Sequence, residues 1–462
     1  MLKFYNLFFK KSYKKKVILL IKDLTRIHNL YNLQIEDTNK NLDLSYKFNL
    51  DLSLWDKLNK IYFSSLSYSS SFPIFKKFLD EYKTQKSLKY TLVDSFSGCG
   101  GLSLGLKNSG FNPILINEII PIFLETNYLN NNVDISSYHL GDIADLVTDS
   151  NVKNLENKTD LFVGGPPCQG FSMANRQRLL NDPRNVLYKH FLNLAKRIKP
   201  KFILMENVRG MYNKISEIQN DFKTVLGTDY TVDNMLLNAK NFSIPQNRER
   251  VFVLATKVKG VDLSRLKKEI LSNKNESKFL LKDAIMNLPS LGKREQKNKS
   301  YIENEKVGFK ITSKDMVNKS YYEDFINKEK YDLIFNHVNR FNNDRDIEIF
   351  SRLPQGANSL HESIKDIMPY KSRNEIFKDK YYKLKSNDIC KTITSHMRLD
   401  CNMYIHPFQA RGLSPREAAR VQSFPDNFIF AGPNNSWYQQ IGNAVPVKLA
   451  EVIGDVIIKY IK

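Results

Sequence analysis

Short apolar strands that alternate with helical segments constrain this chain more than any other feature of its sequence. The run Tyr90–Asp94 leads into a glycine cluster and then a helical pattern, and further strands are expected at 113–117, 161–163, 202–205 and 250–255. Apolar residues recur at helical spacing from Val186 to Ile198, and Pro200 ends that helix. Strands alternating with helices indicate βαβ units and a mostly parallel sheet, so we predict an α/β fold.

The alternation is lost after about residue 258, which predicts a division into domains. Residues 258–410 are charged, rich in Asn and irregular, and a helical pattern returns near the end of the chain. Residues 1–88 are rich in Lys, Asn and Ser. We predict a basic, helical extension over 1–88, an α/β domain over 89–257 and a smaller irregular domain over 258–430. Residues 431–462 should return to the α/β domain as a C-terminal helix.

Composition excludes several classes of protein. Of 462 residues, 42% are hydrophobic and 26% are charged, as in ordinary soluble proteins. The apolar run Val17–Ile21 is far shorter than the roughly 20 residues that cross a bilayer. Four cysteines without Cys-x-x-Cys spacing predict neither a disulfide framework nor a zinc site. We expect a cytoplasmic protein with no membrane segment and no metal.

The net charge of +21 has two interpretations. Lys and Arg release counterions when they bind phosphates, so a polyanionic partner would explain the basic excess. The chain is also rich in Asn, Ile, Tyr and Phe, so the codon bias of an AT-rich genome explains it equally well. Charge alone does not decide between them.

A glycine turn follows the first strand and opens a helix. Residues 94–101 read DSFSGCGG, which is not the dinucleotide fingerprint G-x-G-x-x-G. Such a turn lets a ligand approach the backbone closely. Glu118 ends the second strand, where it could accept both ribose hydroxyl hydrogens, and Asp142 could bind an adenine amino group where a third strand should end. Each alone reads as a tight turn or a surface acid, but together they favour a bound adenosine moiety.

A second group of side chains suggests catalysis. Cys168 follows a Gly-Gly-Pro-Pro loop at the end of a strand, where a thiol is either an inert part of a rigid turn or a nucleophile. Glu206 follows the next strand directly, so it should lie over the same sheet edge and could exchange a proton. Arg248 and Arg250 are two residues apart at a strand start, so both should face one side. Taken alone, surface salt bridging would also explain these charged residues.

The ordered motifs together resemble the cytosine-5 DNA methyltransferases. The resemblance covers about residues 90–256 and 405–462 and consists of FSGCGG, NE, GDI, GGPPCQGFS, ENV, QNRER, RGLSPREAARVQSFPD and QIGNAVPVKLA. It implies a Rossmann-like sheet with helices on both faces, a target-recognition domain at 258–430, and S-adenosylmethionine as methyl donor. It also implies transfer to C5 of a cytosine flipped out of double-stranded DNA. The implied setting is a bacterial restriction-modification system, with a monomeric enzyme and a possible cognate endonuclease.

The resemblance further implies a role for individual residues. Cys168 would add to cytosine C6, Glu206 would hydrogen-bond or protonate N3, and Arg250 with Arg248 would stabilise the O2 side and the catalytic loop. The implied cofactor contacts are Phe96 on adenine, Glu118 on ribose, Asp142 and Ile143 on the adenine edge, Gly98, Gly101, Pro167 and Leu187 as lining, and Asn443 and Val445 at the methionine part. The expected DNA contacts are Gln169 and Ser172 in the loop after Cys168, and Thr392, Thr394 and Arg398 in the recognition region. His396 belongs to the same segment, which is expected to face the DNA.

Three other functions stay open on the sequence. The RNA branch of the same fold methylates a transfer-RNA cytosine, and the long variable region and basic extension favour DNA over it. A non-catalytic DNA-binding regulator would have no need of the nucleophile and the charged residues that accompany it. A nucleotide-dependent dehydrogenase is disfavoured by the glycine spacing. The extension departs from the family pattern and could widen DNA contact, regulate transcription of its own gene, or only pack.

Overall fold

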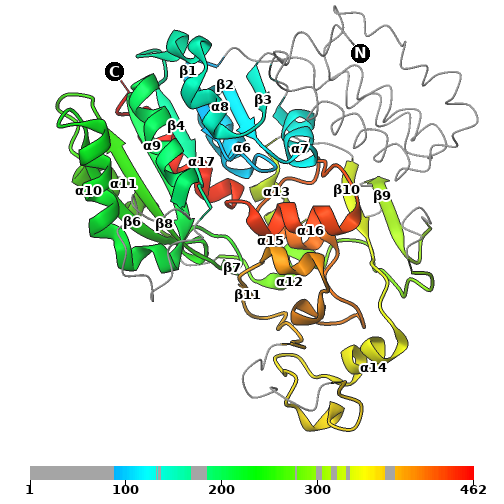
Figure 1. The fold of residues 1–462 in the computed structure, drawn as a ribbon. Helices are drawn as coiled ribbons and strands as arrows, with labels where there is room; N and C mark the ends of the chain where they lie inside the picture. Colours follow the sequence, from blue (N-terminus) through cyan, green and yellow to red (C-terminus); the bar gives the residue numbers. More distant parts are fainter. Residues whose placement is uncertain are drawn as a thin grey trace, which may run out of the picture.

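A seven-stranded sheet forms the centre of the molecule (Figure 1). The computed structural model describes residues 88–131, 133, 137–167, 185–275, 278–297, 304–313, 320–328, 333–369 and 380–461. The strand order is β3-β2-β1-β4-β5-β8-β6. The strands are β1 (Tyr90–Ser95), β2 (Phe111–Glu118), β3 (Tyr138–Leu140), β4 (Leu161–Gly164), β5 (Phe202–Val208), β6 (Thr231–Asn238) and β8 (Glu249–Thr256).

The first five strands are parallel, while β8 runs antiparallel to β5 and β6 antiparallel to β8. The predicted α/β fold with a mostly parallel sheet is confirmed. The chain moves outward from β1 in one direction to β2 and β3, and in the other direction to β4 and β5. Ligands of open α/β sheets bind outside the carboxyl ends of the strands at such a switch point.

Successive residues of the inner strands face two different apolar layers. Leu92 packs in a layer with the helices on one face, and its neighbour Val93 packs in the layer on the other. The first layer contains α6 (Gly101–Ser109), α11 (Leu263–Ser272) and α17 (Val447–Ile458). The second contains α8 (Ile143–Thr148), α9 (Val186–Ile198) and α10 (Ile215–Leu226). Helix α7 (Pro121–Asn131) contacts β2 and β3. Both sheet faces are therefore covered, as parallel strands require.

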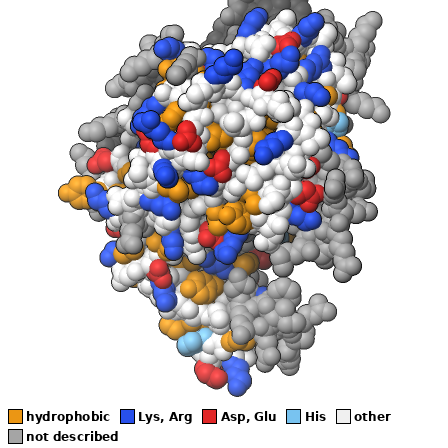
Figure 2. Space-filling view, turned by 90° about the vertical axis from the view of Figure 1, so that its left-hand side faces the viewer, with side chains coloured by type: hydrophobic (Ala, Val, Ile, Leu, Met, Phe, Trp, Pro, Cys, Tyr) orange, Lys and Arg blue, Asp and Glu red, His pale blue; other side chains and the backbone are white. Residues whose placement is uncertain are grey.

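The side of the molecule that carries α10 is shown in Figure 2. Lys and Arg side chains are interspersed there with Asp and Glu, and hydrophobic side chains lie between them. The net positive charge of the chain is therefore not gathered into one continuous basic patch on this face.

Small residues bring the C-terminal helix close to the helix that follows the glycine turn. A Cβ atom at Gly105 of α6 would overlap the backbone of Val447 and approach Ala450 Cβ to 2.5 Å, and one at Gly454 of α17 would lie 2.7 Å from Ser109 Oγ. Glycine at these positions permits backbone contact between α6 and α17. The contact carries the residues just before α17 to the glycine turn.

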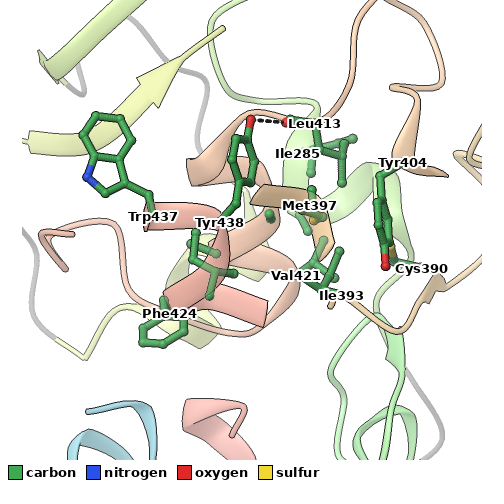
Figure 3. Close-up of a cluster of buried hydrophobic side chains, with 14 of the residues drawn as sticks. Ile285, Cys390, Ile393, Met397, Tyr404, Leu413, Val421, Phe424, Trp437 and Tyr438 are labelled. Atoms are coloured by element: carbon green, nitrogen blue, oxygen red, sulfur yellow. Dashed lines mark hydrogen bonds between the residues drawn. The ribbon is translucent and has the colours of Figure 1, made fainter. Parts of the chain in front are cut away.

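The remaining elements surround a second hydrophobic core, part of which Figure 3 shows. Met397, Tyr404 and Trp437 belong to this core, and Tyr438 Oη donates a hydrogen bond to Leu413 O at 2.7 Å. The elements of this core are β7 (Gln246–Asn247), α12 (Leu281–Ile285), α13 (Tyr321–Ile326), β10 (Leu333–Val338), β11 (Cys390–Lys391), the 3-10 helix η10 (Ser395–Arg398), α15 (Pro415–Val421) and α16 (Asn434–Asn443). The strand β9 (Gly308–Ser313) pairs with β10, and α14 (Asp344–Arg352) packs in a smaller, separate cluster with Tyr381 and Ile405.

Helix α15 is buried along its whole length, although its sequence is rich in charge. Arg411 donates two hydrogen bonds to Glu417, at 2.7 and 2.6 Å, and Arg420 donates two to Asp426, at 2.7 and 2.8 Å. Arg416 instead donates to backbone carbonyls, and burial lowers its pKa to about 9. Buried charges of this kind are tolerated only when they are fully paired.

Candidate active site

A cavity of about 610 Å³ lies at the carboxyl ends of the parallel strands, across the switch point between β1 and β4. Every residue that the sequence assigned to the cofactor lines this cavity: Phe96, Gly98, Gly101, Glu118, Asp142, Ile143, Pro167, Leu187, Asn443 and Val445. Two residues assigned to catalysis, Glu206 and Arg250, line it as well. Residues more than 300 positions apart in the sequence thus share one site.

The glycine turn has an unusual backbone conformation. Phe96 has φ 56° and Gly98 has φ 55°, so both lie in the left-handed region. For a residue with a side chain this costs on the order of 1–3 kcal/mol, and such strain gathers at functional sites. Ser97 N donates to Asn117 O at 3.0 Å, which ties the turn to β2. A Cβ at Gly101 would lie 2.7 Å from Val445 O, so only glycine fits between the turn and the C-terminal segment.

Glu118 is fixed at the end of β2 by three backbone N–H groups. Its Oε2 accepts from Gly98 N at 2.9 Å, and its Oε1 accepts from Ile119 N and Ile120 N, each at 2.9 Å. Burial raises the pKa of Glu118, whereas the three N–H groups favour its charged form. A carboxylate accepts about four hydrogen bonds, so capacity is left for a hydroxyl group of a ligand.

Asp142 lies at the N-terminus of α8 beyond β3. Its Oδ1 accepts from Ala144 N at 3.0 Å and caps the helix. The residue before it is held to β2, because Asn117 Nδ2 donates to Gly141 O at 2.8 Å. The cap occupies one carboxylate oxygen of Asp142, and no hydrogen bond involves its other oxygen among the described residues. The Asp142 side chain therefore caps α8 and still has one carboxylate oxygen that can accept a hydrogen bond from a ligand.

Glu206 and Arg250 form the charged pair of the cavity. Arg250 Nε lies 3.0 Å from Glu206 Oε1, and both side chains are largely buried. Burial raises the pKa of Glu206, and the two nearby guanidinium groups partly oppose that rise. Glu206 lies within β5, which runs on to Val208, rather than after the strand as predicted. Since a Cβ at Gly165 would lie 3.2 Å from Glu206 Oε2, the Gly-Pro-Pro loop packs directly on the carboxylate.

Asn207 holds the loop that precedes the predicted nucleophile. Its Nδ2 donates to Pro166 O at 2.8 Å, and its Oδ1 accepts from Val208 N at 2.9 Å. Pro167 lines the cavity, and the next residue in the chain is Cys168. Cys168, Gln169 and Ser172 lie outside the described residues, so their assignments stay predictions.

Arg248 does not share the environment of Arg250, which corrects the expectation that both face one side. Arg248 is fully buried, is not among the residues lining the cavity, and donates to Ile393 O (2.7 Å), Gly442 O (3.1 Å) and Ala444 O (2.8 Å). The expectation assumed continuous strand alternation. However, β7 ends at Asn247 and β8 begins at Glu249, so the alternation is interrupted at Arg248.

The expected DNA contacts in the recognition region separate into three positions. Thr394 lines the cavity, and its hydroxyl lies 3.1 Å from the hydroxyl of Tyr404. The hydroxyl of Thr392 donates to Asn247 O at 2.6 Å, so it stabilises the junction with β7. Arg398 is exposed at the end of η10.

Sequence reasoning missed several residues of the cavity wall. Ser395 lines the cavity between Thr394 and His396, two residues of the segment expected to face DNA, and Asp94 and Gln440 line it from other elements. Burial raises the pKa of Asp94 to about 7, and its carboxylate accepts a hydrogen bond from Ser103. The position of Asp94 at the end of β1, as the first residue of the glycine motif, was the available signal. No local signal marks Ser395.

Comparisons with known proteins identify the family. A model of the C-5 cytosine-specific DNA methylases matches residues 90–459. The chain belongs to this family. It is 31% identical over 394 residues to the type II methyltransferase M.DdeI of Desulfomicrobium norvegicum, covering 79% of this chain and 87% of the relative. It is also 31% identical over 396 residues to the type II methyltransferase M1.HphI of Haemophilus parahaemolyticus, covering 83% of this chain and 90% of that relative. A solved DNA modification methyltransferase encoded within a prophage of Escherichia coli superimposes with a TM-score of 0.61 at 26% identity, over 80% of this chain and 99% of that one.

As a C-5 cytosine-specific DNA methylase, the chain is an enzyme that transfers a methyl group from S-adenosylmethionine to C5 of cytosine in DNA. The cavity suits this cofactor, since a strained glycine turn faces an anchored carboxylate in a space of ordinary cofactor-site size. In the described part of the chain, no group of His, Cys, Asp and Glu could hold a metal ion. No helix among the same residues is long and apolar enough to cross a membrane.

Proposed function

We propose that the target cytosine enters the cavity between the cofactor residues and the Glu206–Arg250 pair, and that Cys168 is the nucleophile. One observation carries the proposal: the charged pair, the cofactor residues and Pro167 line the same cavity. Cys168 is bonded directly to Pro167, and Asn207 anchors the carbonyl one residue earlier. The proposed nucleophile therefore follows in the sequence directly after a residue of the cavity wall.

The proposed chemistry assigns each side chain a different task. The Cys168 thiolate forms a bond to C6, which breaks the aromaticity of the ring and turns C5 into an enamine-like carbon. Glu206 supplies a proton or hydrogen bond at N3, for which the raised pKa of this buried carboxyl is suited. Arg250 orients Glu206 through Nε and donates Nη1 to Glu249 O, which leaves Nη2 for the O2 atom of the base.

When bound, S-adenosylmethionine supplies an electrophilic methyl group to C5. Water then removes the C5 proton, and the Cys168 thiolate leaves as aromaticity returns. We propose that Glu118 accepts the ribose hydroxyls, that Phe96 stacks on adenine, and that Asp142 with Ile143 reads the adenine edge. Gly98, Gly101, Pro167 and Leu187 would line the cofactor, and Asn443 and Val445 its methionine part. The fixed carboxylate of Glu118 and the positive φ of Phe96 support this arrangement.

We also propose the wider setting of the enzyme. Relatives named as type II methyltransferases support modification of one short DNA sequence in a restriction-modification system, beside a cognate endonuclease. We propose that the enzyme acts as a cytoplasmic monomer. Residues 89–257 would form the catalytic domain, 258–430 the target-recognition domain, and 431–462 the segment that returns to the catalytic domain. Gln169, Ser172 and Arg398 would contact the DNA.

The decisive experiment traps the proposed covalent bond. Sequencing methylated DNA from cells that express the chain first gives the recognition sequence. A duplex of that sequence with 5-fluorocytosine at the target position is then incubated with enzyme and S-adenosylmethionine. Because fluorine cannot leave as a proton does, we expect a stable adduct with the wild type and none with Cys168→Ser. A wild type that methylates ordinary duplex yet forms no adduct, or a fully active Cys168→Ser variant, would overturn the proposal.

A further inference from the structure

An exposed leucine lies one turn away from the wall of the active-site cavity. Thr394, Ser395 and His396 line the cavity, and η10 continues from Ser395 to Arg398. Leu399 N donates to His396 O at 2.9 Å, so Leu399 follows the wall within a single turn. Leu399 is 67% exposed, and among the large apolar side chains of the described residues only Tyr321 is more exposed. Single exposed leucines are common, so the place of this one is what requires explanation.

The turn that carries Leu399 is clamped to the second hydrophobic core. Arg340 donates Nη1 to Met397 O at 2.8 Å and Nη2 to Leu399 O at 2.9 Å. The same guanidinium lies over the ring of Tyr438, 5.5 Å from its centroid, and 3.6 Å from Cys401 Sγ. Tyr438 and Cys401 are fully buried. Two carbonyls of the turn are thus bonded to a side chain that rests on the core, which holds the Leu399 backbone in place.

The turn is also fixed relative to the cofactor residues. A Cβ at Gly442 would overlap the backbone of Thr394 and Ser395, so the turn packs directly on α16. The next residue after Gly442 is Asn443, which lines the cavity. Since this contact joins the turn to the cavity wall, the backbone of Leu399 is held in a fixed position relative to the residues that line the cavity.

The charged side chains next to Leu399 indicate what kind of partner contacts it. Arg398 is exposed, and its guanidinium makes one long hydrogen bond, 3.5 Å to Gln439 Oε1. The carboxylate of Asp400 accepts from Asn402 N at 3.1 Å and so belongs to the next turn. An exposed leucine beside an available arginine suits the two surfaces of a DNA strand, the apolar faces of the bases and the phosphates.

We propose that Leu399 is a wedge that enters the base stack at the target step and occupies the space that the flipped cytosine leaves, while Arg398 binds an adjacent phosphate. The inference rests on the proposed function, because duplex DNA reaches this rim only if the target base enters the cavity. Extruding a base exposes apolar stacking faces to water. A rigidly held apolar side chain offsets that loss by covering them. Leu399 is then a positioning residue that does not touch the reacting atoms.

The test compares substitutions at Leu399 on two duplexes that carry the recognition sequence. One duplex is fully paired, and the other has an abasic site opposite the target cytosine, so that less free energy is needed to flip the base. Leu399→Ala removes the wedge, Leu399→Asn keeps its approximate size but makes it polar, and Leu399→Met keeps it apolar. Leu360→Ala is a matched control, because Leu360 is 46% exposed and does not line the cavity. Single-turnover methylation is measured, together with the fluorescence of 2-aminopurine placed at the target position.

On the paired duplex, Leu399→Ala and Leu399→Asn should lower the single-turnover rate about 10- to 100-fold, which is what burial of one leucine side chain contributes. Both should also lower the fluorescence of the flipped 2-aminopurine. Leu399→Met and Leu360→Ala should behave like the wild type. On the abasic duplex, the rates of the Ala and Asn variants should approach that of the wild type. Affinity for S-adenosylmethionine should be unchanged in all four variants.

Two results would overturn the wedge. Leu399→Ala and Leu399→Asn could methylate the paired duplex at the wild-type rate, which would remove any role for Leu399 in flipping. They could instead be slowed equally on both duplexes, which would assign Leu399 to reading a neighbouring base. A failure of the proposed function gives a different pattern, because the wild type itself would then form no adduct with 5-fluorocytosine.

Discussion

Replacement of Glu118 by Gln tests the cofactor site through one anchored side chain. The carboxylate accepts from Gly98, Ile119 and Ile120, each at 2.9 Å, and the proposed ribose hydroxyls would use its remaining acceptor capacity. Glutamine keeps the shape, but its amide nitrogen cannot accept, so one hydrogen bond to a charged group is lost. Such a bond contributes about 1.5–3 kcal/mol, so the Kd for S-adenosylmethionine should rise about 10- to 150-fold.

Isothermal titration calorimetry with S-adenosylmethionine measures this change directly, and thermal unfolding shows whether the fold is intact. Glu156→Gln is the matched control, because Glu156 pairs with Lys199 and is not a cavity residue. A normal Kd for Glu118→Gln, at an unchanged melting temperature, would remove Glu118 from the cofactor site. Glu118→Ala should also lower the melting temperature, because three N–H groups at the end of β2 lose their acceptor.

Three further predictions concern other contacts of the site and its supports. Arg250→Met removes a guanidinium that lowers the pKa of Glu206. The limb of the kcat–pH profile that depends on Glu206 should therefore move to higher pH, and a limb that does not move would contradict the pairing of the two side chains. Asn207→Ala leaves Pro166 O without its donor, so kcat should fall by an amount equivalent to about 1–3 kcal/mol while calorimetry finds normal cofactor affinity. Arg411→Met leaves Glu417 buried and unpaired, and urea unfolding at pH 7 should give a loss of about 3–5 kcal/mol. Because Arg411 holds the pKa of Glu417 low, this loss should shrink as pH falls below the ordinary pKa of a glutamate, and a pH-independent difference would be inconsistent with ion pairing.

The features that sequence predicted well depend on local periodicity or on strand ends. Helix α9 spans Val186–Ile198, the range that apolar spacing predicted, because a helix face repeats within a few residues. Glu118 and Asp142 were predicted at strand ends, and both line the cavity, because parallel strands bring their carboxyl ends to one edge. The order of the elements along the chain and the direction of the strands were sufficient to predict these positions.

The features that sequence could not predict depend on contacts between distant segments. Ser395 reaches the cavity because Gly442 lets η10 pack against α16, and no periodicity within residues 395–398 indicates that contact. Within the seven-stranded sheet β8 alone runs opposite to the other strands, since β6 is antiparallel to β8 and therefore parallel to β5, and the alternating pattern did not indicate this reversal. The irregular stretch after residue 258 predicted a second domain, but nothing in it indicated which residues form the core of that domain.

The positions of the residues in the QNRER motif show that membership of a motif does not imply contact with substrate. Gln246 accepts from Ile393 N at 2.8 Å and donates to Gln422 Oε1 at 2.8 Å, while Arg248 donates to the carbonyls of Gly442 and Ala444. Both side chains are fully buried, so they join the edge of the sheet to the segments that carry the cavity wall and the cofactor residues. Arg250 alone of the three faces the cavity. All the polar atoms of the Gln246 and Arg248 side chains except Arg248 Nε have hydrogen-bond partners among the described residues. Such matching at a buried junction restricts which residues fit there. The motif therefore combines one residue that lines the cavity with two that fix the segments around it.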